Sequence, residues 1–459
     1  MQKISLAVAV AMSLAIAATA HATSFVVTAK SKTFDSKFEH RLQAAGATIT
    51  ARLPQIGVAI VEADADFGSR ASRLSGVRSA VPDVVIQFDL EGGREELDAD
   101  YANPPYSGDD DAFFDLQWGH AAIDAAGAWN AGYRGAGATV AVLDSGIYCQ
   151  HLDITPNLLA PLSASFVPGE AYCNTSGSSH GTHTSGTVLA ADNGIGTIGV
   201  APEAKLIAVK VLSAASGSGS FGGIIQGIVY AADAGADVIN MSLGVGGGLP
   251  VGGKEVAELI NATARATRYA YAKDVTVVAS AGNDGRDLDH DSGKVCDTDG
   301  VCTTDNLRAF PAQLPGVLAV SALGPVGWLK DPANPDFDIL ASYSNYGQSA
   351  IDFAAPGGNF DYPGEENCTL KGITRPCWVF DMVISSTSGI ASYGWSAGTS
   401  MAAPHVSGVA ALIIGKHGGS LAPSEVERIL RASADDLGKP GNDDAYGAGR
   451  VNAARAVQY

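Results

Sequence analysis

The spacing of apolar and polar residues divides the chain into two patterned regions on either side of an acidic stretch. In the first region, apolar runs of strand length alternate with segments of helical spacing. In chain order these are residues 24–29 (strand), 34–45 (helix), 48–61 (two strands broken near 54–57), 67–79 (helix) and 84–88 (strand). This order predicts a small α+β unit with a ferredoxin-like succession of elements.

The second region, from Phe113 onward, follows a different pattern in which short apolar runs alternate with longer segments of helical spacing. The expected strands are residues 139–143, 205–212, 237–243, 275–280 and 317–322, and the clearest helices are residues 222–234 and 256–272. This alternation predicts a three-layer α/β domain, with a central, mostly parallel sheet covered by helices on both faces. In such sheets functional groups gather at the carboxyl ends of the strands.

The formal net charge of −19 argues against nucleic acid as a partner, because tracking phosphates requires a basic face. A solvated acidic surface is the simplest interpretation of this charge. Part of the charge lies in residues 91–112, which contain Pro104-Pro105 and show almost no apolar period, so we expect a linker there. A linker between folded units is a natural site of proteolytic processing.

The N-terminus and the cysteines indicate export. Lys3 precedes an apolar run, and Ala20-His21-Ala22 fits a cleavage pattern, so residues 1–22 predict a signal peptide; the competing interpretation is an uncleaved anchor. Six cysteines without CxxC pairs favour disulfides over zinc. Pairing of sequence neighbours would give Cys149–Cys173, Cys296–Cys302 and Cys368–Cys377, although about 15 connectivities are possible.

Three short segments carry the candidate chemistry, and each places a reactive side chain at the end of a predicted strand or the start of a predicted helix. They are, in chain order, Val140-Ala-Val-Leu-Asp144-Ser-Gly146, Ser179-His180-Gly-Thr-His183-Thr-Ser-Gly186 and Gly398-Thr-Ser400-Met-Ala-Ala-Pro404-His405-Val. A serine hydroxyl is a weak nucleophile that needs a neighbouring base, and imidazole suits that role. A carboxylate can then fix the imidazole tautomer.

Taken singly, each of these residues has a structural interpretation. Asp144 could be a strand-end turn residue, His180 a surface residue at a helix start, and Ser400 an N-cap. Asp144-Ser-Gly146 is also an aspartic-protease motif with a second copy at residues 291–293, but that copy lies in a polar loop with no apolar strand before it. His183 and His405 are expected to be structural.

Together, the three segments resemble the signature segments of the subtilisin family, in the family's order. The resemblance covers almost the whole chain and implies a subtilisin-like catalytic domain at residues 113–459. It implies a secreted serine endopeptidase that acts through an acyl-enzyme, in which Asp144 orients, His180 is general base and acid, and Ser400 is the nucleophile. The alternative is a catalytically silent secreted binding protein on the same scaffold.

Further segments are similar to the family's substrate site. Residues 277–285 resemble the oxyanion segment, which implies that the Asn283 side chain donates to the developing oxyanion. Residues 240–244 are similar to the wall of the primary specificity pocket, and residues 216–221 resemble the edge that pairs with substrate as an added strand. The implied substrate-binding residues are Ser242, Leu243, Gly244, Ser280, Ala281, Gly282 and Gly219. The resemblance implies broad specificity, with large hydrophobic side chains before the cut.

Residues 23–90 look like the inhibitory propeptide of the same family. The resemblance implies an intramolecular inhibitor that is removed by self-cleavage between about residue 90 and residue 115. It also implies protein and peptide substrates and a monomeric enzyme. The export signal predicts an extracellular or periplasmic location, and we expect no membrane span because no later segment has a long uncharged apolar stretch.

The segment Ala191-Asp-Asn193-Gly-Ile195-Gly-Thr197 resembles the family's strong calcium loop. The resemblance implies a structural Ca2+ and no catalytic cofactor. Its implied ligands are the side chains of Asp153 and Asn193 and the carbonyl oxygens of Ala191, Ile195 and Thr197.

Two features depart from the family pattern around calcium. The family has a glutamine ligand near the mature N-terminus, where alignment on Trp118-Gly119 places Phe114, with Gln117 nearby. Residues 287–305 begin like an EF-hand loop, but glycine comes one position late and the closing Glu is missing. A solvated acidic insertion is therefore favoured there over a second calcium site.

Overall fold

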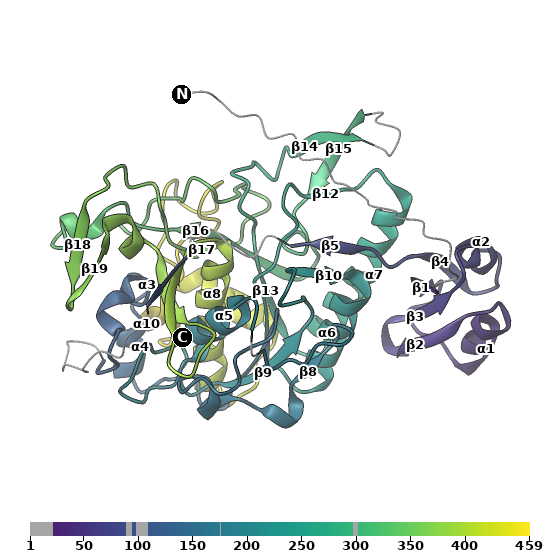
Figure 1. Cartoon of the computed structure of the whole chain (residues 1–459), viewed down its shortest axis with the longest axis horizontal. Helices are drawn as coiled ribbons and strands as arrows, with labels where there is room; N and C mark the ends of the chain where they lie inside the picture. Colours follow the sequence, from purple (N-terminus) through teal and green to yellow (C-terminus); the bar gives the residue numbers. More distant parts are fainter. Residues whose placement is uncertain (1–21, 89–93, 98–108, 175, 297–301) are drawn as a thin grey trace.

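The computed structural model describes residues 22–88, 94–97, 109–174, 176–296 and 302–459 (Figure 1). The predicted signal peptide, apart from its last residue, and most of the predicted linker lie outside these ranges. None of the helices within them is long and apolar enough to cross a lipid bilayer.

Residues 23–82 form a four-stranded antiparallel sheet with two helices on one face. The elements are β1 (Thr23–Ala29), α1 (Ser36–Ala44), β2 (Thr48–Leu53), β3 (Val58–Ala63), α2 (Phe67–Ala71) and β4 (Val77–Pro82). The strand order β2-β3-β1-β4 is the ferredoxin-like arrangement. Asp35 starts α1 as its N-cap, because its carboxylate accepts the N–H of Phe38.

Two segments of this unit differ from the sequence prediction. The helix predicted at residues 67–79 ends at Ala71, and residues 77–82 form β4 instead. The positive φ of Gly76 (88°) turns the chain, and inward residues then alternate with outward ones at a period of two. The strand predicted at residues 84–88 is present as β5 (Val85–Gln87), but it pairs antiparallel with β10 (Ser218–Ser220) of the second region.

The second region is built on a seven-stranded parallel sheet of order β17-β16-β13-β11-β7-β9-β8. Its strands are β7 (Thr139–Asp144), β8 (Ala164–Ser165), β9 (Lys205–Lys210), β11 (Val238–Met241), β13 (Thr276–Ser280), β16 (Val317–Leu323) and β17 (Phe353–Pro356). The predicted three-layer α/β domain is therefore confirmed.

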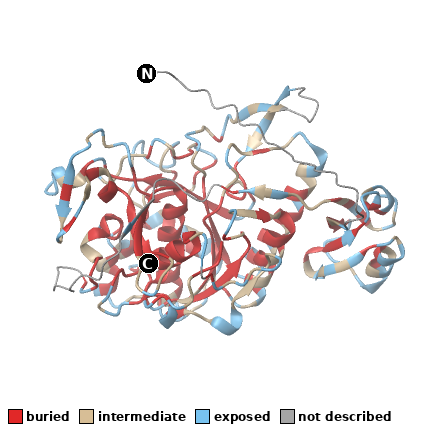
Figure 2. Cartoon of the chain, in the orientation of Figure 1, coloured by how far each residue is buried: buried red, intermediate tan, exposed pale blue. Residues whose placement is uncertain are grey.

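Helices cover both faces of this sheet because successive strand residues point to opposite sides. On β7, Ala141 and Leu143 pack toward α6 (Phe221–Asp233) and α7 (Lys254–Ala272). Val140 and Val142 pack toward the opposite layer. That layer contains α4 (Ala125–Asn130), α5 (His180–Leu189), α8 (Thr399–Lys416), α9 (Pro423–Ser433) and α10 (Ala453–Ala456). The strands of the sheet other than β8, together with α8, are almost entirely buried (Figure 2).

The first unit lies against α6 and α7 at one end of the molecule (Figure 1). Its sheet is apolar on both faces. Phe25 and Val27 pack under its own helices, whereas Val26 and Ile60 belong to the same core as α6 and α7. The two folded units therefore share one hydrophobic core across their junction.

Smaller elements decorate the domain. They are α3 (Trp118–Ala122), the sheet of β12 (Leu249–Pro250), β15 (Cys302–Arg308) and β14 (Ser292–Cys296), the hairpin β18 (Asn367–Leu370) and β19 (Ile373–Pro376), and the sheet of β20 (Val383–Ser386), β21 (Tyr393–Ser396) and β6 (Arg94–Leu97). The Cys149–Cys173 and Cys368–Cys377 disulfides are present. Cys302 is also disulfide-bonded, and β14 and β15 place it opposite Cys296.

Candidate active site

Three elements bring the candidate catalytic residues to one place. Asp144 is the last residue of β7, His180 is the first residue of α5, and Ser400 is the second residue of α8. All three are at least 97% buried. Because β7 lies near the middle of the parallel sheet, its carboxyl end faces the helices that begin at His180 and Ser400.

Asp144 holds the ring of His180. The His180 Nδ1 atom lies 2.9 Å from each carboxylate oxygen of Asp144. The same carboxylate accepts the backbone N–H of Ser145 at 2.6 Å and the hydroxyl of Thr184 at 3.3 Å. The carboxylate is therefore fixed from several directions and sets which imidazole nitrogen carries the proton.

The turn after Asp144 is supported by a buried lysine. Lys210 is fully buried, pairs with Glu170 at 3.0 Å and donates to the carbonyl of Ser145. Asn174 donates its side-chain N–H to the same carbonyl at 2.6 Å. Burial lowers the pKa of Lys210, and the neighbouring Glu170 carboxylate opposes that shift.

Ser400 lies beside Asp144 and His180, but its hydroxyl is oriented toward Ser242. Its hydroxyl donates to the carbonyl of Ser242 at 3.3 Å, and among the described residues His180 Nε2 makes no hydrogen bond. His180 and Met401, the residue after Ser400, line the same hollow. Rotation about the Cα–Cβ bond of Ser400 would redirect its hydroxyl, and such contacts are often loose until substrate binds.

Asn283 is anchored to the start of α8. Its amide oxygen accepts both the backbone N–H and the hydroxyl of Thr399, each at 2.9 Å. Its Nδ2 atom lies 3.6 Å from the position that a Cβ would take on Gly398. The side-chain donor of Asn283 is therefore held next to the turn that leads into Ser400.

A hollow lies beside this site, and four of the predicted substrate-binding residues line it: Gly244, Ser280, Ala281 and Gly282. The sequence did not indicate its other walls, which include Val245, Leu288 and Phe310 on the apolar side and Asp284 and Asp291 on the polar side. Arg286 Nη2 lies 2.5 Å from the Asp291 carboxylate, which is almost fully buried.

The remaining predicted substrate-binding residues lie nearby. Ser242 contacts Ser400 in both directions, because its hydroxyl also donates to the Ser400 carbonyl at 2.7 Å. Leu243 is fully buried. Gly219 lies in β10 and pairs with Ile86 of β5, while the N–H of Phe88 donates to the carbonyl of Gly217. The predicted substrate edge is thus covered by a strand of this same chain.

Among the described residues, the predicted calcium loop combines one buried carboxylate with several oxygens that accept no hydrogen bond. Asp153 is fully buried, and burial raises its pKa to about 7. Its carboxylate accepts the backbone N–H of Thr197 (3.1 Å) and the side-chain N–H of Asn193 (3.3 Å). Within the described ranges, the buried Thr197 hydroxyl has no partner, and no N–H donates to the carbonyls of Ala191, Ile195 and Thr197. This donor set fits a hard cation.

The structure does not support a role for either N-terminal candidate in that loop. The side-chain amide of Gln117 makes two hydrogen bonds to the backbone of Ile198. Its N–H donates to the Ile198 carbonyl at 2.8 Å, and its oxygen accepts the Ile198 N–H at 3.0 Å. Phe114 packs against Trp129.

Each aspartate that suggested an EF-hand has its own partner. Asp287 lies 3.0 Å from the His290 ring, Asp289 accepts the N–H and hydroxyl of Ser349, and Asp291 pairs with Arg286. The acidic insertion is therefore engaged in local contacts.

A sequence model of the subtilase family matches residues 135–449. The chain belongs to the subtilase family. Subtilisin DY of Bacillus licheniformis is 36% identical over 329 residues, which cover 71% of this subtilase and 93% of the relative. Subtilisin E of Bacillus subtilis is 35% identical over 343 residues, which cover 75% of this subtilase and 71% of the relative.

Solved structures share the fold. The epidermin leader peptide processing serine protease of Staphylococcus aureus superimposes with a TM-score of 0.74 over 95% of this subtilase and 98% of that chain, at 22% identity. A protease of Pseudoalteromonas arctica is 30% identical and superimposes with a TM-score of 0.56 over 77% of this subtilase and 99% of that chain. This subtilase is therefore a serine peptidase with the subtilisin fold.

Proposed function

We propose that this subtilase is a secreted serine endopeptidase with Asp144, His180 and Ser400 as its triad. The observation that carries the proposal is the contact between the His180 ring and the buried Asp144 carboxylate at 2.9 Å, beside a serine at the start of α8. Export is supported by the disulfides of the chain, because such bonds persist in oxidising compartments.

In the proposed reaction, the Ser400 hydroxyl rotates toward His180 Nε2 and transfers its proton there as the oxygen attacks the peptide carbonyl. Asp144 stabilises the resulting imidazolium. Asn283 and the Ser400 backbone N–H stabilise the oxyanion. His180 then protonates the leaving amine, which gives an acyl-enzyme, and water repeats the sequence to release the acid and restore the serine.

Substrate would bind as an added strand along Ser218–Ser220, the edge that β5 occupies in this chain. The side chain before the cut would enter the hollow next to Gly244, and the apolar walls of Val245, Leu288 and Phe310 favour a large hydrophobic residue. A peptide library that maps cleavage sites measures this preference. Enrichment of charged residues at that position would contradict it.

Residues 23–90, of which the structure describes 23–88, would act as the inhibitory propeptide, and the enzyme would be a monomer. The support is that β5 covers the substrate edge on one side of the cleft, while β6 pairs with β21, which leads into α8, on the other. Residues 89–93 lie between these strands in the sequence and outside the described residues. Self-cleavage would then fall between about residue 90 and residue 115, the range that the sequence suggested.

Asp153, Asn193, Ala191, Ile195 and Thr197 would hold a structural calcium ion. When bound, the ion would supply positive charge beside the buried Asp153 carboxylate, whose pKa is raised by burial. None of the proposed chemical steps passes through it.

The test uses the full-length chain. Ser400→Ala should lower peptidase activity by about 10⁶-fold and leave an uncleaved precursor, because the nucleophile is gone. A serine-reactive phosphonate should label Ser400 in the native mature protein. Normal processing of the variant would contradict self-cleavage, and absence of labelling would favour the silent binding protein.

A further inference from the structure

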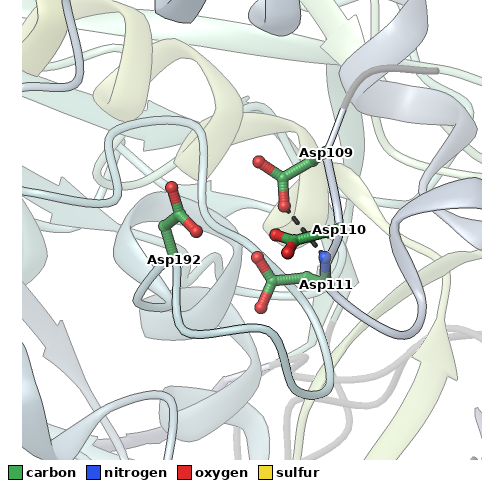
Figure 3. Close-up of side chains that lie close together, drawn as sticks. All are labelled: Asp109, Asp110, Asp111 and Asp192. Carbon is green, nitrogen blue, oxygen red and sulfur yellow. Dashed lines mark hydrogen bonds between the residues drawn. The ribbon is translucent and has the colours of Figure 1, made fainter. Parts of the chain in front are cut away.

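Aspartates gather at two places near the active site. Four of them converge at the predicted calcium loop: Asp109, Asp110, Asp111 and Asp192 (Figure 3). Because Asp192 lies within that loop, this cluster belongs to the calcium region. The second place is the hollow beside Ser400, where Asp284 and Asp291 lie among mostly apolar residues and glycines.

The Asp291 carboxylate lies where it can contact a substrate side chain. It is only 4% exposed, and it lines the hollow that would receive the side chain before the cut. Burial raises the pKa of Asp291, and the positive charge of Arg286 opposes that shift. An aspartate in the specificity pocket of a serine protease sets its preference for the residue before the cut. Without a counter-charge, Asp291 would therefore attract lysine or arginine.

Arg286 supplies that counter-charge. Its Nη2 atom lies 2.5 Å from the Asp291 carboxylate. Two backbone carbonyls hold the guanidinium in place, because Nη1 donates to Gly247 at 2.6 Å and Nη2 donates to Ser292 at 3.3 Å. The ion pair is therefore anchored by the protein itself and leaves the hollow suited to apolar side chains.

The other carboxylates whose charges act on Asp291 have partners of their own. These are Asp284 and Asp287. Asp284 accepts the backbone N–H of Gly247 at 2.8 Å, and Asp287 lies 3.0 Å from the ring of His290. Among the described residues, Arg286 is thus the cation that pairs with Asp291.

The acidic insertion at residues 287–305 fixes Asp291 at the hollow. The N–H of Leu307, in β15, donates to the Asp291 carbonyl at 3.1 Å. The same strand pairs with β12, which follows the hollow wall at Gly248. The insertion is therefore tied to the wall that a substrate side chain would contact.

We propose that the Arg286–Asp291 ion pair determines which charge the enzyme accepts in the side chain before the cut. With both partners present, their charges cancel and the apolar walls decide the preference. Loss of Arg286 would select basic side chains, and loss of the Asp291 charge would select acidic ones. This inference rests on the proposed peptidase function.

The test compares kcat/KM of the mature enzyme on peptide p-nitroanilides that differ only in the residue before the cut: phenylalanine, lysine or glutamate. Active sites are counted with the serine-reactive phosphonate. Arg286→Gln should raise the lysine-to-phenylalanine ratio about tenfold or more, because Asp291 loses its counter-charge. Asp291→Asn should raise the glutamate-to-phenylalanine ratio several-fold, because the guanidinium remains.

The double variant Arg286→Gln/Asp291→Asn removes both charges and should return both ratios to within about twofold of the native enzyme. Arg428→Gln is the matched control, since Arg428 forms an exposed ion pair with Glu425 on α9 and should leave both ratios unchanged.

An unchanged lysine-to-phenylalanine ratio in Arg286→Gln would overturn the inference, and so would an equal gain in the double variant. If Arg286→Gln fails to fold, an unchanged glutamate-to-phenylalanine ratio in Asp291→Asn overturns it instead. A native mature enzyme that neither cleaves these peptides nor reacts with the phosphonate would overturn the proposed function together with this inference.

Discussion

At the scale of single residues, the same side chain takes different roles according to its tertiary partners. His180 meets a carboxylate, whereas the buried His183 ring contacts the carbonyls of Val383 and Gly394. His405 is fully buried in α8, where its Nδ1 contacts the Met401 carbonyl. Among these three rings, only that of His180 has a carboxylate as its hydrogen-bond partner, and a carboxylate stabilises an imidazolium.

The burial of His405 predicts a pH dependence of stability. Burial lowers its pKa to about 4, below the value of about 6.5 in an unfolded chain. Between these values the unfolded chain binds a proton that the folded chain does not. Proton binding by the unfolded chain therefore lowers the free energy of unfolding as the pH falls from 6.5 to 4. The stability that His405 contributes is fully present above pH 6.5 and is lost over that range.

In the Ser400→Ala background, His405→Leu should therefore gain about 3 kcal/mol of stability relative to its parent between pH 7 and pH 4. Urea unfolding at several pH values measures the difference. His40→Leu, at an exposed position, is the matched control. A stability difference for His405→Leu that stays constant across this range would refute the interpretation.

At the scale of elements, backbone hydrogen bonds and a disulfide restrain the turn that follows Asp144 at the end of β7. Residues 147 and 173 form a backbone bridge, with the Ile147 N–H donating to Tyr172 at 2.9 Å. The Cys149–Cys173 disulfide closes the same turn. The Cys368–Cys377 disulfide instead joins the end of the β18–β19 hairpin, away from Asp144.

Removal of these two disulfides should therefore have different consequences. Loop entropy gives about 3.5 kcal/mol of stabilisation for Cys149–Cys173, whose sequence separation is 24, and about 2.7 kcal/mol for Cys368–Cys377, whose separation is 9. Paired serine substitutions should lower the melting temperature in both cases. Only the paired substitution of Cys149 and Cys173 should also lower kcat, because it removes a restraint on the turn after Asp144. Equal loss of kcat in both variants would contradict this assignment.

At the scale of the whole molecule, the first unit docks through a few directional contacts on α7. Arg265 donates to the carbonyls of Ala29, Ser31 and Ile56 at 3.0–3.2 Å. Arg78 pairs with Glu258 at 3.0 Å. Because hydrogen bonds from charged groups are stronger than neutral ones, Arg265 should dominate the polar part of this junction.

Inhibition in trans tests that arrangement. Residues 23–88 added to the mature enzyme should inhibit Arg265→Ala about 10- to 100-fold less tightly than the native enzyme, as expected for losing charge-assisted hydrogen bonds. Arg268→Ala, an exposed arginine on the same helix, is the matched control. Equal inhibition of the two variants would show that the apolar contacts alone hold the units together.

Local patterns predicted most of the elements, because the periods of two and 3.6 residues follow from backbone geometry alone. The helix predicted at residues 67–79 was wrong in its second half, since Val77 satisfies either period and Gly76 decides between them. The strand at residues 84–88 was found correctly. Its partner, β10, lies more than a hundred residues away, and no local pattern reports such a pairing.

By itself, then, the sequence determined the type and order of most of the main elements, the family and the positions of Asp144, His180 and Ser400. Tertiary structure decided what those positions touch: the orientation of the Ser400 hydroxyl, the walls of the hollow at Leu288 and Asp291, and the meeting of Asp111 with Asp192. The physical reason is range. Helix and strand periods act over a few residues, whereas side-chain hydrogen bonds, burial and charge depend on segments that only folding brings together.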